Sequence, residues 1–153
     1  MKEQLKEAWR TSHTITTMFL DQIPAEGFTM SLSTRGGRTV FEQLLHLHKV
    51  RMQWLEIVSK EIFKKYAVEK EAATPKELRK ALDSSAAAID AFIDQSWEKE
   101  GKVSGFKKGL IPFISYLMSH EAHHRGNILL TLKQSKIKIP DSLKWGIWEW
   151  NKI

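Results

Sequence analysis

The chain has 153 residues, of which 42% are hydrophobic, and a formal net charge of +6 at neutral pH. A chain of this length and composition is expected to form one domain, residues 1–153, with enough apolar side chains for a buried core. The absence of cysteine excludes a disulfide framework, a thiolate metal site and a cysteine nucleophile.

The ends and the charges of the sequence indicate a cytoplasmic protein. The first ten residues, MKEQLKEAWR, carry charges where a signal peptide needs an apolar run, and no apolar run is long enough to span a membrane. We therefore expect no membrane partner. Lysines are scattered rather than gathered into a basic block interleaved with aromatic residues, so nucleic-acid binding is not expected either.

The first half of the chain contains two helical patterns. Apolar residues recur at helical spacing over residues 2–22, and Pro24 ends this first segment. The second segment begins with the T-x-x-E capping box of Thr39 and Glu42 and extends to about Phe63. A loop with three glycines separates the two segments.

The second half contains two more long patterns and a short tail. A capping box with proline at the first helical position begins the segment 74–97, and another segment covers residues 110–134. Residues 141–150 predict a short final helix, whose Trp145, Trp148 and Trp150 are expected to pack the terminus onto the other helices. The whole pattern predicts an all-α fold, an antiparallel four-helix bundle with a short C-terminal helical tail.

The stretch SHEAHHRGN, residues 119–127, holds three of the six histidines. His120 and His124 are four residues apart, so on a helix both imidazoles lie on one face, within reach of one metal ion. His123 is expected on the outer flank of that helix. A third histidine from the second segment would complete a three-histidine site with open coordination positions, as in catalytic zinc sites.

Two histidines of the second segment are candidates for the third ligand. His48 has apolar residues four and seven positions away in both directions, so periodicity places it on the buried face of the helix. His46 lies at the edge of that face. Periodicity alone therefore favours His48 as the inward-pointing residue.

The same stretch also contains H-E-x-x-H, the signature of zinc proteases, in which the glutamate is the general base. The downstream histidine of the metzincins is missing, and an all-helical chain lacks a strand edge to align a peptide. We therefore interpret Glu121 as the partner of Arg125 in a partly buried ion pair, and not as a catalytic base.

Three stretches resemble the DinB-like family, a bacterial group of four-helix-bundle metalloproteins that includes YfiT-like proteins and is distinct from the DNA polymerase of the same name. They are TVFEQLLHL at residues 39–47, HEAHHRGNI at residues 120–128, and the tail from LKQS at residue 132 to the WEW at residue 150. In that family the metal ligands are one histidine of the second helix and two of the last long helix. The resemblance places them on His46, His120 and His124, and our prediction follows it, with His48 as the alternative.

The resemblance implies a divalent metal ion, nickel, zinc, iron or manganese, and a homodimer. Some members of the family conjugate low-molecular-weight thiols such as bacillithiol to electrophiles. The leading hypothesis is therefore a metal-dependent thiol S-transferase whose partners are a small-molecule thiol and an electrophile. A metal-dependent hydrolase and a non-catalytic metal-binding protein of the stress response are the alternatives.

Overall fold

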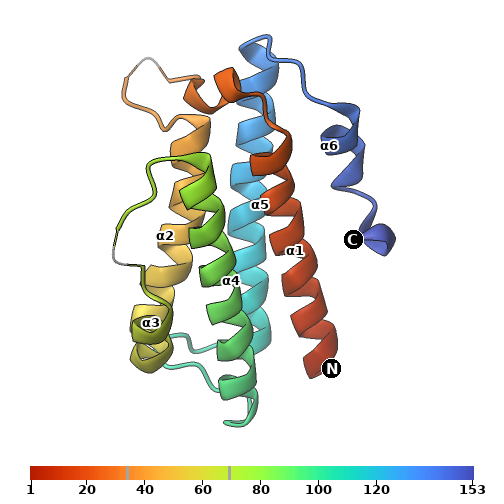
Figure 1. The fold of residues 1–153 in the computed structure, drawn as a ribbon. Coiled ribbons are helices and arrows are strands. Elements are labelled where there is room, and N and C mark those ends of the chain that lie inside the picture. The colour runs from red at the N-terminus through yellow and green to blue at the C-terminus, as the bar shows by residue number, and fades with distance from the viewer. Residues whose placement is uncertain (34, 69) are drawn as a thin grey trace.

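The computed structural model describes residues 1–33, 35–68 and 70–153, and its regular structure in these ranges is helical. Four long helices lie side by side (Figure 1). They are α1 (Lys2–Gln22), α2 (Val40–Val58), α4 (Pro75–Trp97) and α5 (Leu110–Gln134). The shorter elements are α3 (Lys60–Tyr66), α6 (Asp141–Gly146) and the 3-10 turns η1 (Ala25–Thr29) and η2 (Trp150–Lys152).

The capping boxes fix where α2 and α4 begin. The Thr39 hydroxyl accepts a hydrogen bond from the backbone N–H of Glu42 at 3.2 Å, and the Glu42 carboxylate accepts one from the backbone N–H of Thr39 at 2.7 Å. Thr74 and Glu77 repeat the arrangement at the start of α4. Each cap satisfies helix-end N–H groups and stabilises its helix by about 1 kcal/mol. Both predicted starts are confirmed.

The second helix is shorter than the sequence pattern predicts. Its backbone leaves the helical conformation at Ser59, with φ −158° and ψ 86°, and the chain starts again as α3. The break turns α3 so that Ile62 is buried in the same apolar cluster as Leu55. Burial of apolar surface in this cluster compensates for the interruption of the helix. The spacing of apolar residues along the sequence does not reveal the interruption.

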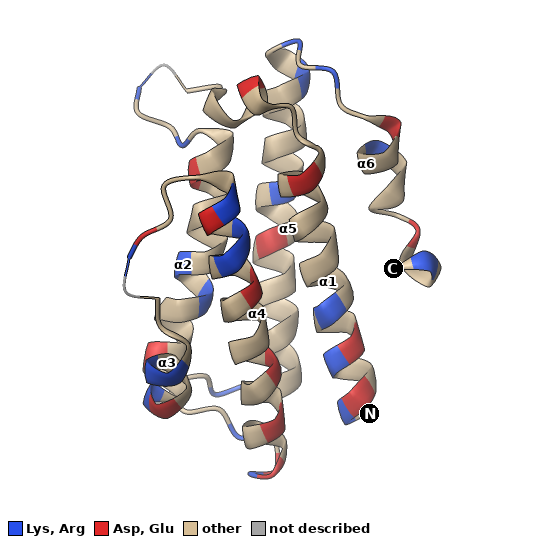
Figure 2. Ribbon diagram, viewed as in Figure 1, with Lys and Arg blue, Asp and Glu red and all other residues tan. Residues whose placement is uncertain are grey.

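Two apolar clusters fill the space between the helices. One includes Phe19, Leu44, Leu132 and Leu143, and the other includes Trp9, Leu55, Phe92 and Phe113, all of them nearly inaccessible to solvent. Figure 2 shows charged positions along α1 and α4, where Lys6 pairs with both Asp90 and Asp94. Burial of the apolar core therefore holds the helices together. The ion pairs lie near the surface, where α1 and α4 face each other.

The four long helices do not alternate in direction. The chain runs along α2, returns to the same end of the molecule between Tyr66 and Thr74, and then runs along α4 in the same direction as α2 (Figure 1). Helices α1 and α5 run the opposite way. The prediction of a wholly antiparallel bundle therefore does not hold for α2 and α4, because the connection before α4 is a long crossover rather than a tight turn.

The C-terminal tail lies against α1 (Figure 1). Its anchor is Leu143, which is completely buried, and Gly146 comes so close to α1 that an added Cβ would stand 2.8 Å from Cε of Met18. The three tail tryptophans were expected to supply this anchor, but Trp145, Trp148 and Trp150 are 59%, 74% and 49% exposed. Within the described ranges, no helix combines the length with the apolarity that crossing a bilayer requires.

Candidate metal centre

Three histidines from two helices meet at the surface between α2 and α5. His46 comes from α2, and His120 and His124 come from successive turns of α5. The ring centroids are 5.3 Å apart for His46 and His120, 4.9 Å for His46 and His124, and 4.7 Å for His120 and His124. One nitrogen of each ring lies within 4.8 Å of the other two. The structure thus brings together the three residues selected by the resemblance.

Helix geometry and one contact from α2 set this arrangement. The i, i+4 spacing stacks His120 and His124 on one face of α5, and α2 packs against that face. Gln43, one turn before His46, places its side-chain oxygen 3.5 Å from Nδ1 of His124. An oxygen at this position favours the proton on Nδ1, which leaves Nε2 of His124 as the free nitrogen.

The three imidazoles are held in the neutral form. Burial lowers the pKa of His46, and the positive charge of Arg38 lowers it further. Burial also lowers the pKa of His120, although the neighbouring Glu121 opposes the shift. For His124, burial and the other two histidines lower the pKa to about 4. Neutral imidazole is the form that binds metal ions, so the cluster is ready to accept one at neutral pH.

His48 points into the core and not toward this cluster. It is 7% exposed, and its side chain lies next to the backbone of Ala81 in α4. Among the described residues its Nδ1 has no hydrogen-bond partner. Periodicity thus identifies His48 correctly as buried, but burial and proximity to the other histidines are different properties. His46 reaches them because it stands at the edge of the apolar stripe, where α2 faces α5.

Glu121 lies in the core, with both carboxylate oxygens taken by neighbouring side chains. Arg51 of α2 donates to Oε1 at 2.7 Å through Nε and to Oε2 at 3.0 Å through Nη2, and Thr16 of α1 donates to Oε2 at 3.1 Å. The predicted partner Arg125 is farther away, at 3.6 Å. Glu121 is therefore a structural residue, in agreement with our rejection of the zinc-protease interpretation.

Arg51 is the residue of this region that the sequence analysis missed. It is fully buried, and its guanidinium also donates to the carbonyl of Leu82 at 3.0 Å and lies 4.9 Å from the ring of Trp9. Burial alone would raise the pKa of Glu121, but the charge and hydrogen bonds of Arg51 outweigh this effect and lower it. An available signal was the position of Arg51 on the apolar stripe of α2, between Leu44 and Leu55.

An aromatic group borders one side of the histidine cluster. The ring of Tyr116 is stacked on that of His120, with centroids 6.4 Å apart and planes inclined by 28°. The indole N–H of Trp54 donates to the Tyr116 hydroxyl at 3.4 Å, and the Trp54 ring packs edge-on against Phe106 and Phe113. These rings form an aromatic border on that side of the cluster.

A cavity of about 400 Å³ borders the other side of the cluster. It lies between residues 31–33 and 37–38 on one side and the outer face of α5 on the other, and His124, Gln43 and Arg38 contribute to its lining. Asn127, which also lines it, donates to Nε2 of the exposed His123 at 3.0 Å and not to a ring of the cluster. Of the three clustered histidines, His124 lines this cavity, which has room for a small ligand.

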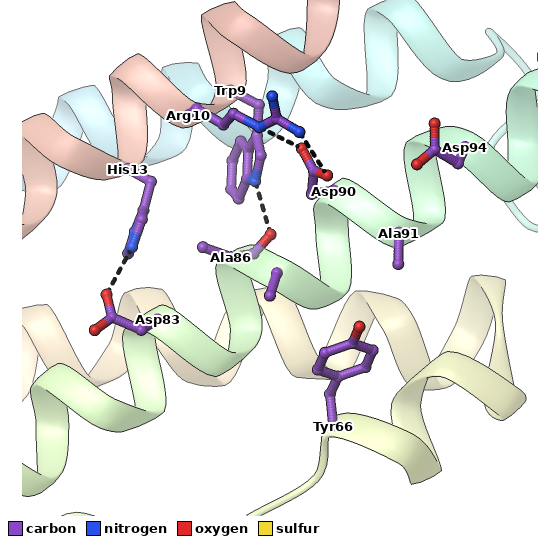
Figure 3. Close-up of a pocket in the computed structure, with 10 residues that line it drawn as sticks. Trp9, Arg10, His13, Tyr66, Asp83, Ala86, Asp90, Ala91 and Asp94 are labelled. Atoms are coloured by element: carbon purple, nitrogen blue, oxygen red, sulfur yellow. Dashed lines mark hydrogen bonds and ion pairs between the residues drawn. The ribbon is translucent and has the colours of Figure 1, made fainter. Parts of the chain in front are cut away.

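A separate cavity of about 450 Å³ lies between α1 and α4. Figure 3 shows that its polar side chains are directed at one another: Arg10 binds Asp90 at 2.9 and 3.1 Å, and His13 binds Asp83 at 2.9 Å. Mutual pairing satisfies these groups. The histidine cluster lies between the other two long helices, and we regard it as the candidate site.

Comparisons with known proteins agree with this architecture. A DinB-like protein from Bacillus cereus, known from a crystal structure at 2.01 Å resolution, superimposes with a TM-score of 0.56 over 90% of this chain and 95% of that chain. The two sequences are 16% identical, so this likeness concerns the fold alone. A search of the curated proteins finds no match. The model of the DinB family matches residues 1–135, which include all three clustered histidines, and the chain belongs to that family.

Proposed function

We propose that this protein binds a divalent metal ion through His46, His120 and His124 and transfers a low-molecular-weight thiol to an electrophilic co-substrate. The observation that carries the proposal is the convergence of three neutral imidazoles, from two helices, beside a cavity of about 400 Å³. A catalytic site needs such a combination of protein ligands and space for a further ligand.

The donor set fits a transition metal. A nitrogen-to-zinc bond is about 2.0–2.1 Å long, so three nitrogens that share one ion lie roughly 3–3.5 Å from each other. The ring nitrogens here lie within 4.8 Å, and modest side-chain rotation closes the difference. Imidazole ligands suit nickel, zinc and iron, whereas manganese prefers carboxylate oxygen. The site therefore favours the first three ions of the four expected.

The metal ion and the surrounding side chains would have different roles in the transfer of the thiol. A divalent ion in this position would lower the pKa of a coordinated thiol, as zinc does for water. The chain has no cysteine, so the reacting sulfur must come from the small molecule. Gln43 orients the ring of His124, and the rings of Trp54 and Tyr116 border one side of the cluster.

The experiment that tests this proposal follows conjugation of a thiol to 1-chloro-2,4-dinitrobenzene, in which the sulfur replaces chloride and hydrogen chloride is released to the buffer. Protein loaded with nickel, zinc or iron should accelerate the reaction, and chelation should abolish the acceleration. His120→Ala should behave like the metal-free protein. His13→Gln is the control, because His13 lines the separate cavity between α1 and α4 and bonds to Asp83 there.

The outcomes separate the three hypotheses. A metal-dependent rate that His120→Ala removes supports the transferase. Metal binding with no turnover for thiols but with hydrolysis of an activated ester supports the hydrolase instead. Metal binding without any metal-dependent rate indicates the non-catalytic protein and overturns the catalytic part of the proposal.

A further inference from the structure

The cavity beside His124 contains an arginine whose charge is not neutralised by an ion pair. Arg38 lines this cavity and is exposed, and its guanidinium forms no ion pair with a carboxylate of the residues that the structure describes. The buried or partly buried cations Lys6, Arg51 and Arg79, by contrast, have carboxylate partners. An arginine that borders a cavity without such a partner is available to bind an anion from solution.

Arg38 lies close enough to the histidine cluster to act on the same ligand. Burial is the main cause of the lowered pKa of His46, His120 and His124, and the positive charge of Arg38 contributes to the lowering at each of them. His124 and Arg38 line one continuous cavity. A molecule of a few carbon atoms with two different functional groups can therefore contact both.

The remaining lining of the cavity suits a small polar ligand. Asn127 and Thr131 supply an amide and a hydroxyl from α5, and Leu32 and Leu130 supply short apolar surfaces. Its volume of about 400 Å³ is near the lower end of the range for small-molecule sites. Among the described residues that line the cavity, Arg38 supplies a positive charge and none supplies a carboxylate.

We propose that Arg38 binds a carboxylate of the thiol substrate in this cavity, so that the preferred substrates are small thiols that carry carboxylate groups. This inference rests on the proposed function, because the sulfur of the same molecule is directed at the histidine cluster. Arg38 is here a residue that determines specificity. The guanidinium fork and a carboxylate match in geometry and charge.

The test compares two thiols on protein loaded with Co²⁺, whose visible absorption reports ligand binding. Mercaptosuccinate carries two carboxylates, and 2-mercaptoethanol carries none. The wild type should bind mercaptosuccinate at least about tenfold more tightly, since one hydrogen-bonded charge pair contributes roughly this factor. Arg38→Gln should lose that preference and keep its affinity for 2-mercaptoethanol and for Co²⁺.

Arg35→Gln is the matched control. Arg35 belongs to the same exposed segment and carries the same charge, but it does not line the cavity. Its replacement should leave the preference intact. Equal affinity of the wild type for both thiols, or an equal loss of preference in both arginine variants, would overturn the inference and leave the metal-binding proposal standing.

A second experiment uses the metal-free protein, so that a failure of metal binding can be distinguished from a failure of anion binding. Addition of succinate should shift the backbone amide resonances of Ser33 and Gly37 in the wild type and not in Arg38→Gln. If Co²⁺ does not bind but these shifts occur, the proposed function is wrong and the anion site is real. Absence of the shifts contradicts the anion site itself.

Discussion

Arg51 and Glu121 form a bidentate ion pair in the core, with N–O distances of 2.7 and 3.0 Å, and this pair connects α2 directly to α5. Arg51 lies five residues after His46, and Glu121 is the neighbour of His120. The pair therefore fixes the two helices at the height where the histidine cluster forms. A buried charge pair contributes little net stability, but it opposes any shift that would separate its partners.

Removal of one partner of this pair should be strongly destabilising. Arg51→Met leaves the Glu121 carboxylate buried without its main partner, and we expect unfolding free energy to fall by about 3–5 kcal/mol. Urea denaturation followed by circular dichroism measures the change. The double variant Arg51→Met/Glu121→Leu should recover most of the loss, because it leaves no buried charge uncompensated.

The matched control for this prediction is Arg10→Met, which removes an exposed arginine of the Arg10–Asp90 pair. Its effect should be below about 1 kcal/mol. If Arg51→Met were no more destabilising than Arg10→Met, Arg51 could not be the buried connection between α2 and α5.

Acid should weaken the metal-free protein well above the range in which carboxylates titrate. The folded-state pKa is about 4 for both His13 and His124, mainly through burial, whereas histidine in an unfolded chain titrates near 6.5. Between these values the unfolded state binds more protons, so stability is full above pH 6.5 and declines as pH falls toward 4.

Denaturation of the metal-free protein at pH 7.5, 6 and 5 measures this decline. The variant His13→Gln should lose part of the pH dependence, since its side chain cannot take up a proton. A stability that stays constant from pH 7.5 to pH 5 would show that these histidines are not held neutral by the fold.

The tail should depend on Leu143 and not on its tryptophans. Leu143→Ala removes a completely buried side chain, and we expect a loss of about 2–5 kcal/mol or detachment of the tail. Trp148, which is 74% exposed, should be replaceable by alanine within about 0.5 kcal/mol. Hydrogen exchange of the amides in α6 compares the two variants. Equal protection in Leu143→Ala and the wild type would contradict this role of Leu143.

The parts of the fold that the sequence predicted correctly are those that depend on residues close together in the chain. The capping boxes at Thr39 and Thr74 and the proline at position 75 act within a few residues, and the helix starts that they predict are correct. The break at Ser59 and the shared direction of α2 and α4 depend on packing between distant segments. Periodicity within one helix contains no information on such packing.

The site shows the same limit. The i, i+4 pair His120 and His124 is visible in the sequence, but the choice between His46 and His48 depends on which helix each faces. Periodicity reports burial, and it therefore favoured the histidine that contacts α4. The family resemblance carried the information on the third member of the cluster. The expectations of a homodimer and of a cytoplasmic location stay predictions.

The most direct test of the metal site is the metal content of protein purified without an affinity tag, read by elemental mass spectrometry after exposure to nickel, zinc and iron. The wild type and His123→Ala should each hold close to one ion per chain, and His46→Ala and His124→Ala should lose it. His48→Ala should keep its metal, although loss of a buried ring lowers its stability. A wild type without metal, or metal that is lost in His48→Ala and kept in His46→Ala, would contradict the proposed centre.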